Sequence, residues 1–266
     1  MTSRSAQTST ACVTPEQAIA ALPELAGARV ATRAGDGLTA ETWRLARDGT
    51  DVMLRIDKPA ARALGLDRGA EFILLDQLRD TGIAPVPLAC DAGRGLLATC
   101  WLDGRILDSR ELRDPDTLEA IGRLLARLSR LNIQAPTIDL MATLRRYAQQ
   151  AGQTDSGPLV QSASALRTQI PGSADPCLCH HDIHAGNLVR RPDGRLSLVD
   201  WEYAAMGDPA FDLAVLAEEG GLADSDLARL LQGYGAAGGE VVRERLIAWR
   251  PFYRLLRQAW QAAVQA

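Results

Sequence analysis

Apolar positions along the chain follow two different periods, and the period changes near residue 102. Before this point, short segments alternate apolar and polar residues, as strands do. The predicted strands cover residues 28–34, 41–47, 51–56, 86–89 and 96–101. Helices are predicted from Thr14-Pro15 to about Leu25, where threonine suits the cap and proline the first turn, and at residues 67–80. This part of the chain is expected to form a small sheet.

Beyond residue 102 the apolar positions recur every three or four residues, which is typical of helices with one buried face. The clearest run consists of Leu118, Ile121, Leu124, Leu125, Leu128 and Leu131. Further helices are predicted at residues 138–150, 159–169, 211–218, 224–234 and 240–265, and Pro251 should kink the last one. We therefore predict an α+β protein with a flexible tail (1–13), a sheet-containing lobe (14–102) and a mainly helical lobe (103–266).

One stretch, residues 177–212, collects most of the polar chemistry. All three histidines of the chain, at positions 180, 181 and 184, lie in it. Two apolar runs, residues 187–189 and 196–199, are joined by the turn Pro192-Asp193-Gly194, which predicts a β-hairpin. The loops at its ends carry four side chains with oxygen donors: Asp182, Asn187, Asp200 and Glu202. We expect such clustered oxygen donors to hold a charged ligand.

The spacing H-x-D-x-x-x-x-N, from His180 through Asp182 to Asn187, is the frame of the catalytic loop of protein kinases. Asp200 follows one hairpin later, where protein kinases have a magnesium-binding aspartate. Phosphoryl transfer needs a carboxylate that orients the attacking hydroxyl and accepts its proton, and oxygen ligands that hold Mg²⁺ against the nucleotide. We therefore predict Asp182 as the catalytic residue, and Asn187 and Asp200 as metal ligands.

Three segments carry a resemblance to a known family: H-H-D-I-H-A-G-N-L-V, L-V-D-W-E-Y-A and G-D-P-A-F-D-L-A. Together they resemble the aminoglycoside phosphotransferase and choline kinase superfamily, and are most similar to bacterial thiamine kinases and choline-kinase-like enzymes. The resemblance implies a bilobal protein-kinase-like fold, with a small antiparallel sheet in the N-terminal lobe. It also implies an enzyme that uses ATP and Mg²⁺ to phosphorylate the hydroxyl of a small alcohol.

The resemblance also implies which residues bind the nucleotide. The third strand of the family carries a lysine or arginine that contacts the ATP phosphates, and Arg55 matches this position. Lys58, the only lysine of the chain, is the alternative, but it lies past the strand beside Pro59. Glu71 matches the helix glutamate that pairs with the strand cation, although glutamate also favours the first turn of any helix.

Two other segments match nucleotide-binding positions less fully. Gly35 and Gly37 match a glycine-rich loop over the phosphates, but Ala40 stands where the third glycine would be. The loop is therefore also compatible with an ordinary hairpin turn. Backbone groups from Cys100 to Leu102 match the segment that pairs with adenine.

The acceptor is expected to bind near the C-terminal helices, as in the superfamily. Aromatic rings at Trp249 and Tyr253, with Glu202 and Tyr203 beside the metal ligand, could hold an organic cation by cation–π attraction. The alternative for such a stripe is ordinary helix core. The resemblance favours thiamine as the acceptor, followed by choline or ethanolamine, and then by an aminoglycoside or a sugar.

Other interpretations of the same residues remain open. The histidines and Asp182 could form a transition-metal site, as in a metal-dependent hydrolase, but this leaves Asn187 without a role. A pseudokinase that binds nucleotide without turnover would explain the incomplete glycine loop. His180 is expected to brace its loop, and Asp208 and Asp212 are expected to be loop and helix-cap residues.

Length and composition narrow the class of protein. The chain has 266 residues, 47% of them hydrophobic, enough for a sizeable core. Its net charge of -4 disfavours nucleic acid as a partner. Five cysteines without framework spacing indicate a reducing, cytoplasmic setting. We predict neither a membrane span nor a secretion signal, and the oligomeric state stays open.

Overall fold

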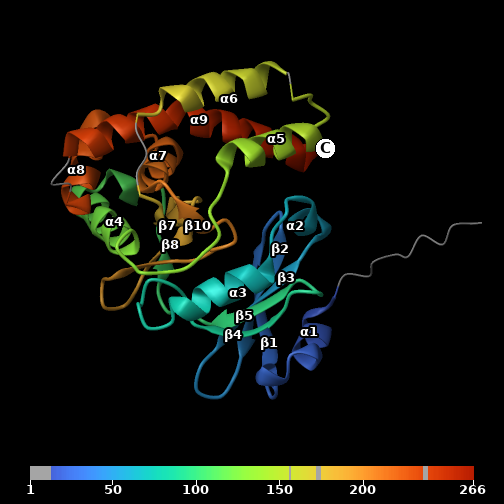
Figure 1. The fold of residues 1–266 in the computed structure, drawn as a ribbon. Helices are drawn as coiled ribbons and strands as arrows, with labels where there is room; N and C mark the ends of the chain where they lie inside the picture. The colour runs from blue at the N-terminus through green and yellow to red at the C-terminus, as the bar shows by residue number, and fades with distance from the viewer. Residues whose placement is uncertain (1–12, 156, 172–174, 236–238) are drawn as a thin grey trace, which may run out of the picture. The chain divides into compact units, whose positions relative to one another are not determined.

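The computed structural model describes residues 13–155, 157–171, 175–235 and 239–266 (Figure 1). Residues 1–12 of the predicted tail lie outside this part. The chain divides into two compact units. The first consists of the described residues up to Gly69 together with Pro87–Trp101, and the second of Ala70–Val86 and Leu102–Ala266. The predicted lobe limits at 14–102 and 103–266 stay a prediction.

The first unit contains a five-stranded antiparallel sheet, whose strands lie at the predicted positions to within a few residues. Their order is β1 (Arg29–Asp36), β2 (Ala40–Ala46), β3 (Val52–Asp57), β5 (Leu96–Cys100) and β4 (Pro87–Asp91). The N-terminal helix is shorter than predicted, because α1 (Pro15–Ala21) stops and a separate turn, η1 (Pro23–Leu25), follows. Leu22 between them is extended, as a residue before proline prefers. A short helix, α2 (Pro59–Ala63), follows β3.

One face of this sheet forms the core of the first unit. Val52, Leu54 and Ile56 on β3 are at most 4% exposed and belong to one cluster with Ala18 and Leu25 of the N-terminal segment. Residues between them in sequence must point to the opposite face, because side chains alternate along a strand. Burial of one face therefore fixes the register of β3.

The second unit is mainly helical. Its helices are α4 (Pro115–Leu128), α5 (Leu140–Gln150), α6 (Pro158–Gln169), α7 (Pro209–Gly220), α8 (Asp224–Tyr234), α9 (Gly239–Gln265) and most of α3 (Arg68–Gln77). These confirm the predicted helices, and Pro251 lies inside α9 as expected. The predicted kink at Pro251 stays a prediction. Among the described residues, no helix combines the length and apolar character needed to cross a bilayer.

Two small sheets lie among these helices. One pairs β6 (Arg105–Ile106), β8 (Leu188–Arg190) and β9 (Leu196–Leu198), and the other pairs β7 (Cys177–Cys179) with β10 (Ala205–Gly207). Short helical turns, η2 (Glu111–Arg113) and η3 (Ala185–Asn187), precede α4 and β8. Helix α9 contacts α5, α6 and α7, as Figure 1 shows. The small sheets therefore lie within a helical framework of the same unit.

Two glycines allow helices α4 and α8 to touch at their backbones. A methyl group on Gly122 of α4 would come within 2.2 Å of the carbonyl oxygen of Leu230. A methyl group on Gly233 of α8 would come within 2.1 Å of the carbonyl oxygen of Glu119. Both distances are far below van der Waals contact, so these helices can pack this closely only because Gly122 and Gly233 have no side chain.

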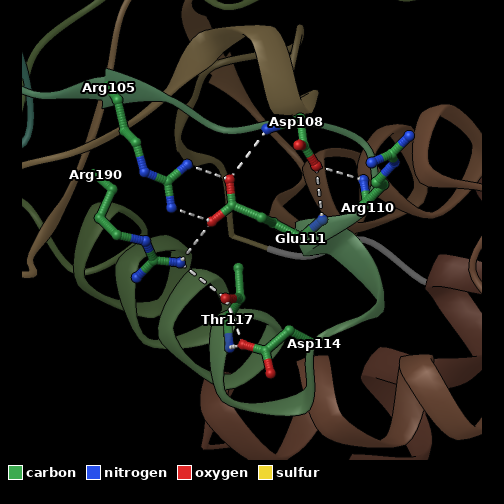
Figure 2. Close-up of polar contacts among 7 residues, drawn as sticks. All are labelled: Arg105, Asp108, Arg110, Glu111, Asp114, Thr117 and Arg190. Atoms are coloured by element: carbon green, nitrogen blue, oxygen red, sulfur yellow. Dashed lines mark hydrogen bonds and ion pairs between the residues drawn. The ribbon is translucent and has the colours of Figure 1, made fainter.

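A cluster of ion pairs ties β6 and β8 to the start of α4 (Figure 2). Arg105 donates two hydrogen bonds to the carboxylate of Glu111, at 2.5 and 2.7 Å. Arg190, which pairs with Arg105 across the strands, reaches the same carboxylate at 3.5 Å and the hydroxyl of Thr117 at 2.8 Å. The Arg105 guanidinium in particular lowers the pKa of Glu111 to about 2. Glu111 therefore anchors the strand that begins just after Asn187.

Replacing Gly122 by alanine should destabilise the protein. The intrinsic helix preference of alanine would add about 1 kcal/mol of stability, but overpacking against backbone costs about 1–3 kcal/mol and more where nothing can move. We expect a net loss of at least about 1 kcal/mol in the free energy of unfolding, measured by urea denaturation. The matched control is Ala165→Gly on the exposed face of α6, which isolates the helix preference. A G122A variant more stable than wild type would contradict the close approach.

Glu111→Gln should weaken the unit at neutral pH and remove part of its acid sensitivity. The pKa of Glu111 is lower in the folded protein than its ordinary 4.5, so the carboxylate stabilises fully above pH ~4.5 and loses its effect as pH falls toward 2. We expect a loss of about 1 kcal/mol at pH 7 and a smaller wild-type-to-variant difference at pH 3, from urea denaturation at both values. Asp193→Asn, which breaks an exposed pair with Arg195, is the control and should change little. An equal difference at both pH values would exclude this role.

Candidate active site

The predicted hairpin is formed by β8 and β9, which pair in antiparallel register. Asn187 ends the turn η3 immediately before β8, and Asp200 lies just beyond β9. The amide of Val199 donates to the carbonyl oxygen of Asn187 at 3.0 Å. The hairpin therefore brings the two predicted metal ligands to the same end of one strand pair.

The side chain of Asn187 is bonded to the loop that carries Asp182. Its Nδ2 donates to the main-chain oxygen and to Oδ2 of Asp182, both at 2.9 Å. Because these bonds use both amide hydrogens, Oδ1 of Asn187 is the atom left to face a ligand. Magnesium prefers oxygen ligands, so this carbonyl and the carboxylate of Asp200 form a donor set that fits the predicted ion.

Asp200 has a left-handed backbone conformation, with φ 66°, which is uncommon for a residue other than glycine. The charge of Asp200 affects the pKa values of His180 and His184, as the charge of Asp182 also does. The contact with the carboxylate of Asp182 is the main cause that raises the pKa of His184, and the charge of Asp200 adds to it. Burial lowers the pKa of His180, and both carboxylates oppose that shift. The structure thus brings Asp182, Asn187 and Asp200 together, while their catalytic roles stay predictions.

A buried carboxylate holds the backbone of the catalytic loop. Asp212 accepts hydrogen bonds from the main-chain amides of His180 and His181, at 2.8 and 2.7 Å. Burial raises the pKa of Asp212 to about 7, although these two hydrogen bonds oppose the shift. Asp208 is the N-cap of α7, as predicted, and accepts from the amide of Ala210 at 3.0 Å.

The role of Asp212 was missed from the sequence, where only a cap or loop role was expected. A signal was present, because the residue interrupts the apolar run A-F-D-L-A-V-L inside a helix. A carboxylate inside such a run is costly unless it finds donors, and here the donors are backbone amides 31 and 32 residues away.

The three histidines have three different partners. Nε2 of His180 lies 3.0 Å from the carbonyl oxygen of Val199, and its ring packs edge-on against Trp201, which fits the predicted bracing role. The ring of His181 is buried against Phe211, and burial lowers its pKa to about 4. His184 faces Asp182, with 3.7 Å between Nε2 and Oδ2. Among the described residues, no three His, Cys, Asp or Glu side chains gather into a possible metal site, so the transition-metal alternative lacks converging ligands.

Tyrosine side chains from helices α5 and α9 and from the loop between β9 and β10 lie close enough to Asp182 for its charge to affect them. Burial is the main cause that raises the pKa of Tyr147, Tyr203 and Tyr253, and the charge of Asp182 adds to each shift. Glu202 contributes to the shifts of Tyr147 and Tyr203. Of the predicted pocket residues, Glu202, Tyr203 and Tyr253 therefore lie in the neighbourhood of Asp182.

Two bonds order these aromatic rings. The indole of Trp260 on α9 donates to the hydroxyl of Tyr203 at 3.1 Å. The hydroxyl of Tyr253 donates to Glu219 at 2.7 Å. Tyr147 of α5 was not predicted, because the aromatic stripe read from α9 gives no information about other helices. Trp260 lies on the same helix as Trp249 and Tyr253.

Trp249 lies in the core of the second unit. It is 3% exposed, its indole donates to Asp208 at 2.6 Å, and its ring packs edge-on against Phe211 and Phe252. Arg245 from the same helix also binds Asp208. Through these contacts, α9 fixes the position of the N-terminal end of α7. The predicted contact of Trp249 with an acceptor stays a prediction that these surroundings do not favour.

In the first unit, Arg55 and Lys58 have different surroundings. Arg55 is 6% exposed and lies within β3, where it pairs with Leu97 of the neighbouring strand. The ammonium group of Lys58 binds the carboxylate of Asp36 and the carbonyl oxygen of Gly37, the latter at 2.7 Å. Lys58 is therefore engaged with the turn after β1. Nucleotide binding by Arg55 stays a prediction.

The other residues predicted to bind the nucleotide lie in strands, turns and a helix of both units. Gly35 lies within β1, not in a loop, and the amide of Gly37 donates to Ala40 across the turn at 3.0 Å. Cys100 ends β5, and Leu102 begins the next part of the second unit. Glu71 is buried in the first turn of α3. The glycine loop is thus a hairpin turn in form, and binding of phosphate or adenine by these residues stays a prediction.

Known proteins resemble this chain in sequence. A thiamine kinase of Escherichia coli is 32% identical over 157 residues, which cover 55% of this chain and 53% of that protein. The protein LicA homolog of Mycoplasma capricolum is 24% identical over 177 residues, which cover 66% of this chain and 71% of that protein. The chain therefore spans about half the length of the thiamine kinases that it matches.

Solved structures share its fold. A choline/ethanolamine kinase family protein from Mesorhizobium loti has a TM-score of 0.74 and 24% identity, covering 91% of this chain and 82% of that one. Choline kinase LicA from Streptococcus pneumoniae has a TM-score of 0.76 and 19% identity, covering 89% and 86%. LicA in complex with AMP gives 0.75 and 18%, covering 90% and 85%. These likenesses confirm the predicted bilobal α+β kinase fold.

The family model described as the phosphotransferase enzyme family, APH, matches residues 30–249. This range contains the predicted site residues from Gly35 to Trp249. It confirms the resemblance of the catalytic loop to the aminoglycoside phosphotransferase and choline kinase superfamily. The chain therefore belongs to the phosphotransferase enzyme family, whose members are kinases of small molecules.

Proposed function

We propose that this protein transfers the γ-phosphate of ATP to the hydroxyl of a small, cationic alcohol, with thiamine as the first candidate acceptor. The observation that carries the proposal is the pairing of Asn187 with Asp182 at 2.9 Å at the hairpin end that also carries Asp200. The AMP complex of the similarly folded LicA supports an adenine nucleotide as donor. We propose a cytoplasmic setting, in which both substrates are available.

The proposed reaction needs one carboxylate with a free oxygen. Oδ2 of Asp182 accepts from Asn187, so Oδ1 can receive the acceptor hydroxyl. As that oxygen bonds to the γ-phosphorus, its proton passes to Asp182, and the bond from the γ-phosphorus to the bridging oxygen of ADP breaks. Asp182 mainly orients the hydroxyl, because phosphoryl transfer depends on positioning and charge neutralisation.

The remaining predicted residues hold the nucleotide and its metal ion. Mg²⁺, when bound to Asn187 Oδ1 and the carboxylate of Asp200, would neutralise phosphate charge. Arg55 would contact the phosphates, and Glu71 would pair with Arg55. The amides at Gly35 and Gly37 would cover the phosphates, and the backbone from Cys100 to Leu102 would pair with adenine. We retain the division into lobes at 14–102 and 103–266 as part of this proposal.

A cationic acceptor suits the charges beside Asp182. The carboxylates of Glu202 and Glu219 join Asp182 among the groups that raise tyrosine pKa values there. A cation would be favoured by these charges and by the faces of Tyr203 and Tyr253, at ~0.5–2 kcal/mol for each ring. Similarity to thiamine kinases over about half the chain supports thiamine. The choline kinase folds support choline or ethanolamine as the second candidate.

A panel of acceptors tests the proposed function. We expect ADP release from ATP and Mg²⁺ to depend on thiamine or choline, and much less on kanamycin or hexosamines. Asp182→Asn should lower kcat by ~10²–10⁴ while leaving the fold intact. Nucleotide binding without turnover of any acceptor would favour the pseudokinase, and hydrolysis unaffected by Asn187→Ala would favour a hydrolase.

Two substitutions at Asp200 separate its charge from its backbone strain. Asn tolerates φ 66° better than other non-glycine residues, so Asp200→Asn should keep the melting temperature and raise the Mg²⁺ concentration needed for half-maximal rate. Asp200→Ala should lose the same activity and also ~1 kcal/mol of stability. Mg²⁺-dependent kinetics and thermal unfolding measure the two effects. Unchanged Mg²⁺ dependence in Asp200→Asn would remove this residue from the metal site.

A further inference from the structure

His184 makes contacts with both ends of the catalytic loop. Its Nδ1 accepts a hydrogen bond from the amide of Gly186 at 3.1 Å, which caps η3. Its main-chain oxygen accepts from the amide of Asn187 at 3.0 Å. On the other side of the ring, Nε2 lies 3.7 Å from Oδ2 of Asp182. The predicted roles of Asp182 and Asn187 do not account for this imidazole.

The Gly186 bond decides where the imidazole carries its hydrogen. A neutral histidine has one N–H and one acceptor nitrogen. Because Nδ1 accepts from Gly186, the hydrogen must be on Nε2, the atom that faces Asp182. At 3.7 Å this contact is longer than a full hydrogen bond, but contacts in unliganded active sites often shorten when substrate binds.

Gly186 is required for the imidazole to lie there. A methyl group on Gly186 would come within 2.8 Å of Cε1 and 3.0 Å of Nδ1 of His184. Ser, Thr, Asn or Asp, the usual capping residues, could accept from the same amide, but they have no second nitrogen directed at Asp182. The second ring nitrogen of His184, near Asp182, is therefore not needed for capping.

We infer that His184 is a positioning residue, whose imidazole links the turn before Asn187 to the carboxylate of Asp182. Oδ2 of Asp182 accepts from Nδ2 of Asn187 at 2.9 Å, and the same atom lies 3.7 Å from Nε2 of His184, close enough for the imidazole to become a second donor when substrate binds. With Oδ2 held from two sides, the rotation of the carboxylate is restricted and Oδ1 is presented to the acceptor. This inference rests on the proposed function, because it assigns Oδ1 to the acceptor hydroxyl.

Two substitutions at this position separate the two contacts. His184→Asn keeps an oxygen near Nδ1 for the Gly186 amide but has no group near Asp182. His184→Gln places its amide nitrogen near the position of Nε2 but gives up the cap. We expect His184→Asn to keep its melting temperature and lose about tenfold in kcat, with the KM for ATP unchanged. His184→Gln should melt about 2–4 °C lower and keep kcat within about threefold.

The opposite order of kcat values in these variants would overturn the inference, and so would a wild-type kcat in His184→Asn. Both results would leave the proposed function intact, provided that Asp182→Asn is inactive with the same acceptor. A purely structural role for His184 predicts that kcat follows the melting temperature in both variants, which also counts against positioning.

A measurement without substrate tests the contact directly. Nitrogen-15 NMR of histidine-labelled protein should give three imidazoles, and the signal that His184→Asn removes belongs to His184. We expect this ring to carry its hydrogen on Nε2, and its Nε2 resonance to shift in Asp182→Asn. A hydrogen on Nδ1, or no shift in Asp182→Asn, would overturn the inference. If no acceptor is turned over, the proposed function fails, while this measurement still decides the link between His184 and Asp182.

Discussion

The loop that carries Asp182 depends on the hydrogen bonds that Asp212 accepts from two consecutive main-chain amides. Burying a carboxylate is costly, as its raised pKa reflects, and the cost is tolerated because the amides of His180 and His181 also need partners. Helix α7 supplies Asp212, and Asp208 at its cap is bound by Trp249 and Arg245 of α9. The position of the loop that carries Asp182 is therefore determined by helix α9 through α7.

Strain is concentrated at the same place. His181 and Asp200 are the non-glycine residues with positive φ in the described part of the chain, at 64° and 66°. Such a conformation costs about 1–2 kcal/mol for each residue. It persists because surrounding contacts fix it, including the ring of Phe211 against His181. Both residues adjoin the proposed reacting groups, so stability is given up where side chains must point in particular directions.

What could be predicted from the sequence was mainly local. The hairpin, its turn and the spacing from Asp182 to Asn187 lie within a few residues of one another, and alternation identified β3. A helical stripe, however, shows which face is buried and not what that face meets, so Trp249 could not be told from Tyr253. The bond from Asp212 to the loop spans about thirty residues, and the position of Tyr147 depends on how α5 and α9 pack. Such contacts arise from tertiary structure, which no periodicity encodes.

The chain has a single lysine, and that lysine closes the turn after the first strand by binding Asp36 and Gly37. Every other basic side chain apart from the histidines is arginine, which does not react with amine-directed reagents under mild conditions. Chemical acylation would thus convert one internal ammonium group into a neutral amide, and would do so at the turn proposed to cover the phosphates. Among the side chains of this chain, amine chemistry would therefore modify that turn alone, although a free α-amino group would react as well.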